Sequence, residues 1–163
     1  MESMVTWHLE TWSNVQSVRG RLEAYRESER DIAVQSEEYE RVKTRLEGLG
    51  GQVISDMPKS PNTVADRMSD LISQKIELEE ELGEEITAHR EERRNIRQTL
   101  KKLKSADERA VIRFRYLLGL GWCDVADAMY GDRTDYLEKE SSYLRRVQRL
   151  HGQALEHLAE FNV

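Results

Sequence analysis

Apolar residues recur at spacings of three and four over two long stretches of the chain, which is the period of an amphipathic α-helix. In the first stretch, about residues 5–49, a narrow apolar stripe runs through Glu- and Arg-rich sequence and ends at a group of glycines. In the second stretch, residues 64–104, a similar stripe follows a loop that contains both prolines. The patterns predict two long helices, the second of them ~60 Å long if unbroken.

Two long helices joined by a modest loop pack antiparallel most easily, so we expect a helical hairpin or coiled coil over residues 1–104. Asn62 or Thr63 is the expected N-cap of the second helix. Folding back within one chain and pairing between two chains are both compatible with these stripes. Because both stripes are narrow, we hypothesise that a second copy of the chain completes the core as a homodimer.

The pattern changes at Ser105, where Ser105-Ala106-Asp107-Glu108 matches the capping box that begins many helices. A dense apolar segment, residues 110–118, follows, and Gly119-Leu120-Gly121 forms a predicted turn. We assign residues 105–163 to a second domain. Strand-like alternation is missing from the sequence, so the predicted fold is all-α.

After the turn, the sequence predicts a short helix over residues 122–130, a polar stretch over 132–140 and a final helix from about 141 to 161. A short helix, a glycine-containing turn, a second short helix and a basic helix follow one another in a helix-turn-helix. The final helix is basic because residues 141–153 contain three arginines and no acidic residue. We therefore expect the final helix to enter the major groove of DNA.

The outward side of the final helix is the candidate DNA-binding face. Apolar residues repeat along the other side and are expected to dock on the preceding helices. Arginine suits guanine edges and phosphates, glutamine suits adenine edges, and serine or tyrosine suits phosphates. His151 either contacts a phosphate or makes a local structural interaction. The predicted DNA-contacting residues are Ser142, Tyr143, Arg145, Arg146, Gln148, Arg149 and His151.

Composition supports long solvated helices more than one large compact core. Of the 163 residues, 38% are hydrophobic and 34% are charged. The net charge of −6 argues against simple electrostatic DNA binding. However, the local charge of the binding face matters more than the charge of the whole chain.

Nothing in the sequence favours an enzyme, a metal site or a cofactor. No phosphate-binding glycine loop, nucleophile elbow or catalytic triad is recognisable. The four histidines are far apart, and the single cysteine, Cys123, fits a reducing cytoplasm. No secretory signal or membrane-spanning stretch is recognisable, so we expect a cytoplasmic protein. A solvated helix surface is the expected role of the acidic cluster Glu77, Glu79, Glu80, Glu81, Glu84 and Glu85.

Three segments together resemble region four of bacterial sigma factors: residues 107–116, residues 119–126 and residues 149–155. Taken together, these segments are more specifically similar to the phage-encoded late-gene regulators of the RinA and ArpU type. The Met57-Pro58-Lys59-Ser60-Pro61-Asn62 loop also resembles that group. The resemblance implies promoter binding through the final helix, with contact to host RNA polymerase. The 132–140 stretch is longer than the tight turn of a minimal region four, so the chain departs from that pattern just before the recognition helix.

A full sigma factor also needs a part that binds the −10 element, and nothing in this chain resembles one. We therefore expect an accessory activator. An alternative from another class is a protein-interaction module that binds RNA polymerase or another phage protein without touching DNA. A third possibility is a structural coiled-coil protein with a fortuitous resemblance near its end.

Overall fold

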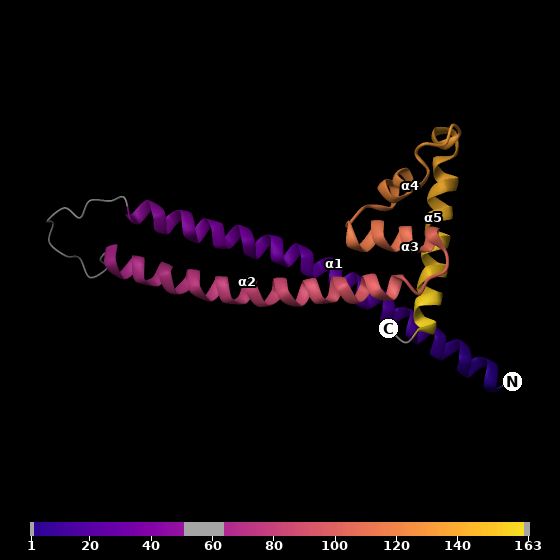
Figure 1. Ribbon diagram of the computed structural model, residues 1–163, viewed down its shortest axis with the longest axis horizontal. Helices are drawn as coiled ribbons and strands as arrows, with labels where there is room; N and C mark the ends of the chain where they lie inside the picture. Colours follow the sequence, from indigo (N-terminus) through magenta and orange to yellow (C-terminus); the bar gives the residue numbers. More distant parts are fainter. Residues whose placement is uncertain (1, 51–63, 162–163) are drawn as a thin grey trace. The chain divides into compact units, whose positions relative to one another are not determined.

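The computed structural model describes residues 2–50 and 64–161, with side chains for residues 13–49 and 65–161 (Figure 1). The described residues contain no strand, which confirms the all-α prediction. The elements are α1 (Glu2–Gly50), α2 (Val64–Leu100), α3 (Ala106–Ile112), the π-helical turn η1 (Arg113–Leu117), α4 (Trp122–Tyr130) and α5 (Tyr136–Glu160).

Most helix bounds agree with the periodicity of the sequence, and α4 has the predicted bounds. The beginning of α5 differs, because helical structure starts at Tyr136 inside the stretch predicted to be irregular. Lys139 interrupts this helix with φ −120° and ψ 20°, so regular winding starts close to the predicted Ser141. The expected N-cap at Asn62 or Thr63 and the 57–62 loop motif lie outside the described residues.

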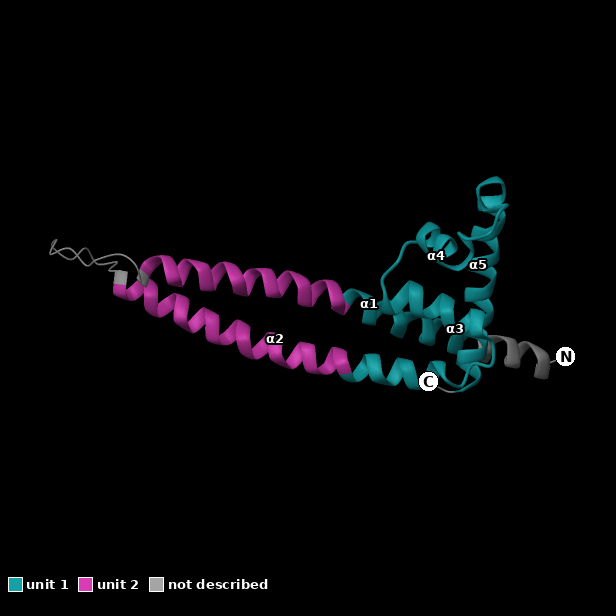
Figure 2. Ribbon diagram, turned by 45° about the horizontal axis from the view of Figure 1, so that its top comes forward, with its two compact units in different colours: residues 1–27, 91–163 teal, residues 28–90 magenta. Residues whose placement is uncertain are grey.

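The chain forms two compact units (Figure 2). Unit 1 comprises residues 1–27 and 91–163, and unit 2 comprises residues 28–90. The sequence predicted a boundary between residues 104 and 105, so the structure divides the chain differently. The reason is packing, because the first half of α1 and the last part of α2 contribute to the same core as α3 and α5.

In unit 2, the segments of α1 and α2 run antiparallel within one chain. Ser28 Oγ lies 2.8 Å from His89 Nδ1, and Gln35 Nε2 donates to Glu85 Oε1 at 2.9 Å. Farther along, the Lys75 ammonium lies 5.5 Å from the centre of the Tyr39 ring. Along these contacts the residue numbers increase on α1, from 28 to 39, and decrease on α2, from 89 to 75, which is the order of an antiparallel pair.

Unit 1 contains two apolar clusters that meet at α3 and α5. The first core joins α1, α2, α3, η1 and α5, and it consists of Val18, Leu22, Tyr25, Ile96, Leu100, Leu103, Ile112, Tyr116, Leu117, Ala154, Leu155, Leu158 and Ala159. The second core joins α3, α4 and α5, and it consists of Val111, Val125, Ala126, Tyr130, Tyr136 and Val147. Both cores use the apolar side of α5 and so fix which side of that helix faces solvent.

The predicted turn between the short helices forms at Gly119. The amide of Leu118 donates to the carbonyl of Arg113 at 3.0 Å, which is the wide hydrogen bond of a π-helical turn. Gly119 follows with a φ of 67°, a conformation that glycine adopts without the steric cost of a Cβ atom. The turn reverses the chain and brings α4 against α5.

Candidate nucleic-acid interface

Helix α5 is anchored along one side and exposed along the other. Val147, Ala154 and Leu158 are buried at spacings of seven and four residues, so they lie on one side of the helix. These residues pack against the first and second cores. The opposite side is therefore available to a partner along the length of α5.

Five of the predicted contact residues lie on that exposed side: Ser142, Arg145, Arg146, Gln148 and Arg149. No ion pair joins the guanidinium groups of the three arginines to any residue of the described ranges. Arg146 lies over the Tyr130 ring, 5.2 Å from its centre, so its guanidinium is oriented by a cation–π contact. We call these five residues the α5 basic face.

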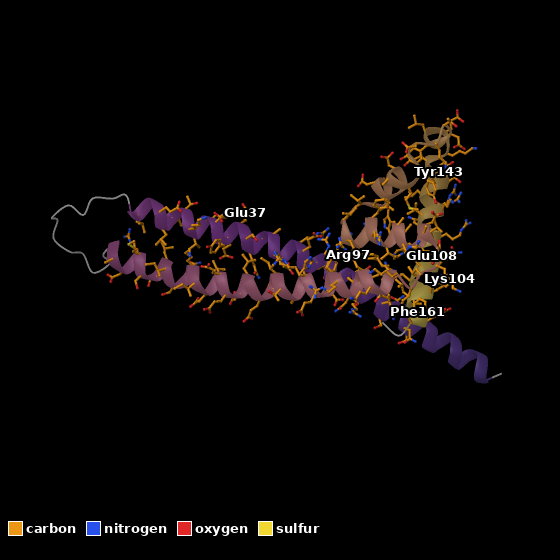
Figure 3. The ribbon with its side chains drawn as sticks, in the orientation of Figure 1. Glu37, Arg97, Lys104, Glu108, Tyr143 and Phe161 are labelled. Atoms are coloured by element: carbon orange, nitrogen blue, oxygen red, sulfur yellow. The ribbon has the colours of Figure 1, made fainter. Side chains whose placement is uncertain are left out.

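Tyr143 has a partly structural role. Its side chain is labelled in Figure 3. Its hydroxyl donates to Asp135 Oδ1 at 2.8 Å, and its ring stacks on Tyr130 with centres 5.0 Å apart. The hydrogen bond to Asp135 raises the pKa of the Tyr143 hydroxyl. Asp135 also accepts from Lys139 Nζ at 2.9 Å, and these two bonds lower the pKa of its carboxyl group. Asp135 is therefore engaged by a cation and a hydroxyl.

An open groove of about 550 Å³ runs beside the first turns of α5. Its wall contains three cations, Lys139, Arg146 and Arg149, and one acid, Asp135. The remaining lining residues are Ser142, Tyr143, Leu150 and Gln153. A groove with this lining suits an anionic, hydrogen-bonding ligand such as a phosphate backbone.

Three further polar residues near the α5 basic face were not predicted from the sequence: Arg133, Lys139 and Gln153. The Arg133 guanidinium lies 5.8 Å from the centre of the Tyr130 ring, the same ring that Arg146 covers. Lys139 and Gln153 line the groove. Gln153 stands four residues after Arg149, one helical turn away within α5, and that spacing is the signal that could have found it.

His151 corrects the predicted contact set because it is buried, with 7% of its surface exposed. Its Nε2 lies 2.9 Å from the Tyr116 hydroxyl, and its ring meets the Trp122 ring edge-on at 4.9 Å. Burial lowers the pKa of His151 to about 4, and the nearby Arg19 and Arg115 cations contribute to the decrease. A neutral, buried imidazole does not contact a phosphate, so the local structural interpretation of His151 holds.

Arginines hold the turn before α4. Arg26 Nη2 donates to the carbonyl of Gly119 at 2.9 Å, and Arg115 Nη1 donates to the carbonyl of Leu120 at 2.8 Å. Arg115 also lies over the Trp122 ring at 4.5 Å. Burial and the neighbouring Arg26 charge lower the pKa of Arg115. These contacts fix the turn, and with it the start of α4, against α1.

The predicted capping box forms only in part. The amide of Glu108 donates to Ser105 Oγ at 3.3 Å, as expected. The Glu108 carboxylate is buried and meets His157 Nδ1 of α5 at 2.9 Å. This contact ties the beginning of α3 to the last turns of α5, and it raises the pKa of His157.

Among the described residues, no group of three or more His, Cys, Asp or Glu side chains is arranged to hold a metal ion. Cys123 is a free, exposed thiol. None of the described helices combines the length and apolarity that crossing a membrane requires.

The α5 basic face and its groove thus form the best-developed candidate site in the described parts of the chain.

No protein-family model, no curated protein sequence and no solved structure matches this chain.

Proposed function

We propose that this protein is a sequence-specific DNA-binding transcription regulator whose helix α5 enters the major groove. The observation that carries the proposal is the α5 basic face, where three exposed arginines lack ion-pair partners among the described residues. Unpaired cations favour phosphate contacts, and arginine and glutamine side chains that extend from a helix suit the readout of base edges.

The negative net charge of the whole chain does not conflict with DNA binding, because charge is distributed unevenly between the two units. Unit 2 contains 15 acidic and 8 basic residues, whereas unit 1 contains 16 acidic and 17 basic residues. The negative charge of the protein thus comes from the unit that does not contain α5. Ser142, Lys139 and Arg149 supply phosphate-binding groups along the groove, and Arg145, Arg146 and Gln148 are candidates to read base edges.

The order α3, turn, α4 and α5 supports the assignment of a helix-turn-helix in which α5 is the recognition helix. The resemblance to phage late-gene regulators extends the proposal to an activator that acts at promoters with host RNA polymerase. On this proposal the partners are double-stranded promoter DNA and RNA polymerase, and the protein works in the bacterial cytoplasm.

A second candidate function is a protein-interaction module that binds RNA polymerase or another phage protein without touching DNA. Its support comes from unit 2, where acidic residues outnumber basic ones by 15 to 8. Unit 2 also exposes large aliphatic side chains, with 67% of Val34 and 50% of Ile76 exposed. Apolar side chains among charged ones are common at protein interfaces.

Selection from a library of random and genomic duplexes at two salt concentrations tests the proposal. The variant Arg145→Ala, Arg146→Ala, Arg149→Ala removes three charges from α5. The matched control Arg30→Ala, Arg41→Ala, Arg45→Ala removes three exposed charges from unit 2. We expect the wild type and the control to enrich one motif and the α5 variant to lose it. Failure of the wild type to retain DNA, together with salt-independent binding to RNA polymerase, would favour the interaction module.

A further inference from the structure

The last part of α2 and the four residues that follow it form a second basic segment of the chain, with a higher net charge than residues 141–153 of α5. Residues 91–104 contain six basic residues, Arg93, Arg94, Arg97, Lys101, Lys102 and Lys104, and only two acidic ones, Glu91 and Glu92. The whole segment belongs to unit 1, as does α5. Neither the candidate DNA interface nor the packing of unit 1 accounts for so many cations.

Some of these charged side chains already interact with other residues of unit 1. Arg21 holds Glu92 through two contacts, one of them from Nη2 to Oε2 at 3.0 Å, and this pairing lowers the pKa of the Glu92 carboxyl group. Lys102 lies over the Phe161 ring at 5.7 Å. Arg93 is half-buried. One acid is thereby neutralised, and four cations remain.

These four cations are exposed, and we call them the α2 basic face: Arg94 and Arg97 of α2, and Lys101 and Lys104 just after its end. Figure 3 labels Arg97 and Lys104. At 100° per residue, Arg94, Arg97 and Lys101 fall within about 60° of one another around the helix axis. The chain keeps winding after Leu100, because the amide of Lys101 donates to the carbonyl of Gln98 at 3.2 Å. All four residues are exposed, and none forms an ion pair with a residue of the described ranges.

The buried side of the same segment explains why the cations point outward. Ile96, Leu100 and Leu103 have 4% or less of their surface exposed and belong to the first core. The segment is therefore held firmly by one side. Its cations stand on a rigid support and do not depend on a flexible tail.

Offsetting the helix dipole does not account for the α2 basic face. Cations near a helix C-terminus are stabilising, but the effect is confined to the last turn. Of these cations, the last turn of α2 contains only Arg97. The remaining cations are consistent with an anionic partner.

We propose that the α2 basic face binds the phosphate backbone of the duplex that α5 reads, without regard to sequence. This inference rests on the proposed function. Leu158 of α5 lines the same small cavity as Ile96 and Leu100, which places the α2 segment beside the end of α5. Sixteen residues separate Leu158 from Ser142, or ~24 Å of helix, about twice the width of the major groove. The α2 basic face therefore contacts backbone outside the groove that α5 enters.

Four cations on one face also suit an acidic protein surface, such as unit 2 of a second copy. DNA is the better fit because the chain already presents an unpaired arginine face on the same unit, and two separate cationic faces suit a long polyanion. An acidic protein partner is a distinct outcome of the test below.

The test measures the affinity of the full chain for a random-sequence 40-bp duplex over a range of salt concentrations. The α2 variant is Arg94→Gln, Arg97→Gln, Lys101→Gln, and the matched control is Arg30→Gln, Arg41→Gln, Arg45→Gln in unit 2. We expect the α2 variant to lower the slope of log affinity against log salt by about two to three units, at about 0.9 per phosphate contact. The control keeps the wild-type slope, and Arg94→Lys with Arg97→Lys keeps it as well, because lysine also binds phosphate as a point charge.

The motif enriched by selection separates this inference from the proposed function. The inference holds if the α2 variant enriches the same motif as the wild type while binding all duplexes more weakly. A wild-type slope in the α2 variant, with circular dichroism unchanged, overturns the inference and leaves the role of α5 intact. A change in self-association at low salt without a change in the DNA slope also overturns it, in favour of an acidic protein partner. If the wild type enriches no motif but the α2 variant still lowers the slope, the sequence-specific function fails and the backbone contact stands.

Discussion

Units 1 and 2 both contain segments of the long helices α1 and α2, yet the contacts that stabilise each unit internally differ. In unit 1, α1 and α2 contribute to a core that also contains α3, η1 and α5. In unit 2 the same helices meet through polar contacts such as Ser28–His89 and Gln35–Glu85, and Val42 is the one hydrophobic side chain in its described part that is fully buried. Two helices alone cannot bury a wide apolar face, so unit 2 keeps charged residues on most of its surface.

The different packing of the two units affects function as well as stability. A unit with a large core can hold unpaired arginines at fixed positions, because their helix is anchored from its other side. Unit 2 has less apolar anchoring, and its acidic surface fits repulsion of DNA or contact with a protein. The difference implies that the two units respond to substitution, and to pH, in different ways.

The largest expected difference is the response to the same substitution at two positions of α2. Leu100 is 1% exposed in the first core of unit 1, whereas Leu78 is half-buried in unit 2. We expect Leu100→Ala to lower the free energy of unfolding by about 2–5 kcal/mol and Leu78→Ala to lower it by clearly less. Urea unfolding followed by circular dichroism and hydrogen exchange measures both. Equal losses would contradict the contrast between the two units.

The next effect is a pH dependence confined to unit 1. The pKa of His151 is lowered to about 4 from 6.5, so its neutral form contributes stability that is fully present above pH 6.5. This contribution is lost as the pH falls from 6.5 towards 4, and it amounts to at most about 3 kcal/mol.

Unfolding of the wild type and of His151→Gln, compared from pH 7.5 to 4, isolates the effect of His151 from nearby carboxyl groups such as that of Glu23. The substitution should flatten the profile over this range. His89→Gln in unit 2 is the matched variant and should leave the unit 1 profile unchanged. Parallel profiles for the wild type and His151→Gln would show that the buried imidazole does not titrate as expected.

A smaller effect is expected at the turn of unit 1. Gly119→Ala forces a φ of 67° on a residue with a Cβ atom, and no atom lies within 4 Å of that Cβ, so the cost of about 1–2 kcal/mol arises in the backbone alone. Gly83→Ala in unit 2 also meets no neighbouring atom, but it lies within a regular helix and should stabilise by up to about 1 kcal/mol. Denaturant midpoints measure both, and a loss at Gly83 or a gain at Gly119 would contradict the assignment.

The smallest effect concerns the contact between Glu108 and His157. Glu108 raises the pKa of His157, so this pair stabilises below pH 6.5 and its contribution is lost as the pH rises through the folded pKa. Because His157 is half exposed, the loss in Glu108→Gln should be under about 1 kcal/mol. In an NMR titration, the pKa of His157 should fall in Glu108→Gln, while that of His151 should not move. An unchanged His157 pKa would argue that Glu108 is not its partner in solution.

Local features of the fold were predictable from the sequence because they depend on neighbouring residues. The three-four spacing of apolar residues predicts the long helices, and Gly119 predicts the turn because a φ of 67° favours glycine. Ser105 predicts the start of α3 because its hydroxyl accepts from the Glu108 amide. Each of these signals acts over fewer than five residues.

Tertiary features were harder to predict. The division of α1 and α2 between two units depends on packing partners such as Tyr25 and Leu155, which are far apart in the sequence. The carboxylate of Glu108 meets His157 in place of a partner in its own helix, which no local pattern indicates.

The burial of His151 did have a sequence signal. Val147, His151, Ala154 and Leu158 are spaced by four, three and four residues, which places His151 on the buried side of α5. The exposed arginines of α5 were predictable by the same rule. Arg133 was not, since its place beside Tyr130 depends on the irregular residues before α5.

The most direct test of the central claim, that α5 reads DNA in the major groove, is methylation of guanine N7 by dimethyl sulfate in the duplexes that the wild-type protein retains. Guanine N7 lies in the major groove and is an acceptor for arginine. We expect the wild-type protein to protect specific guanines. The variant Arg145→Ala, Arg146→Ala, Arg149→Ala should abolish this protection, and the unit 2 control should preserve it. Absence of retained duplexes, or protection that survives loss of the three arginines, would contradict the claim.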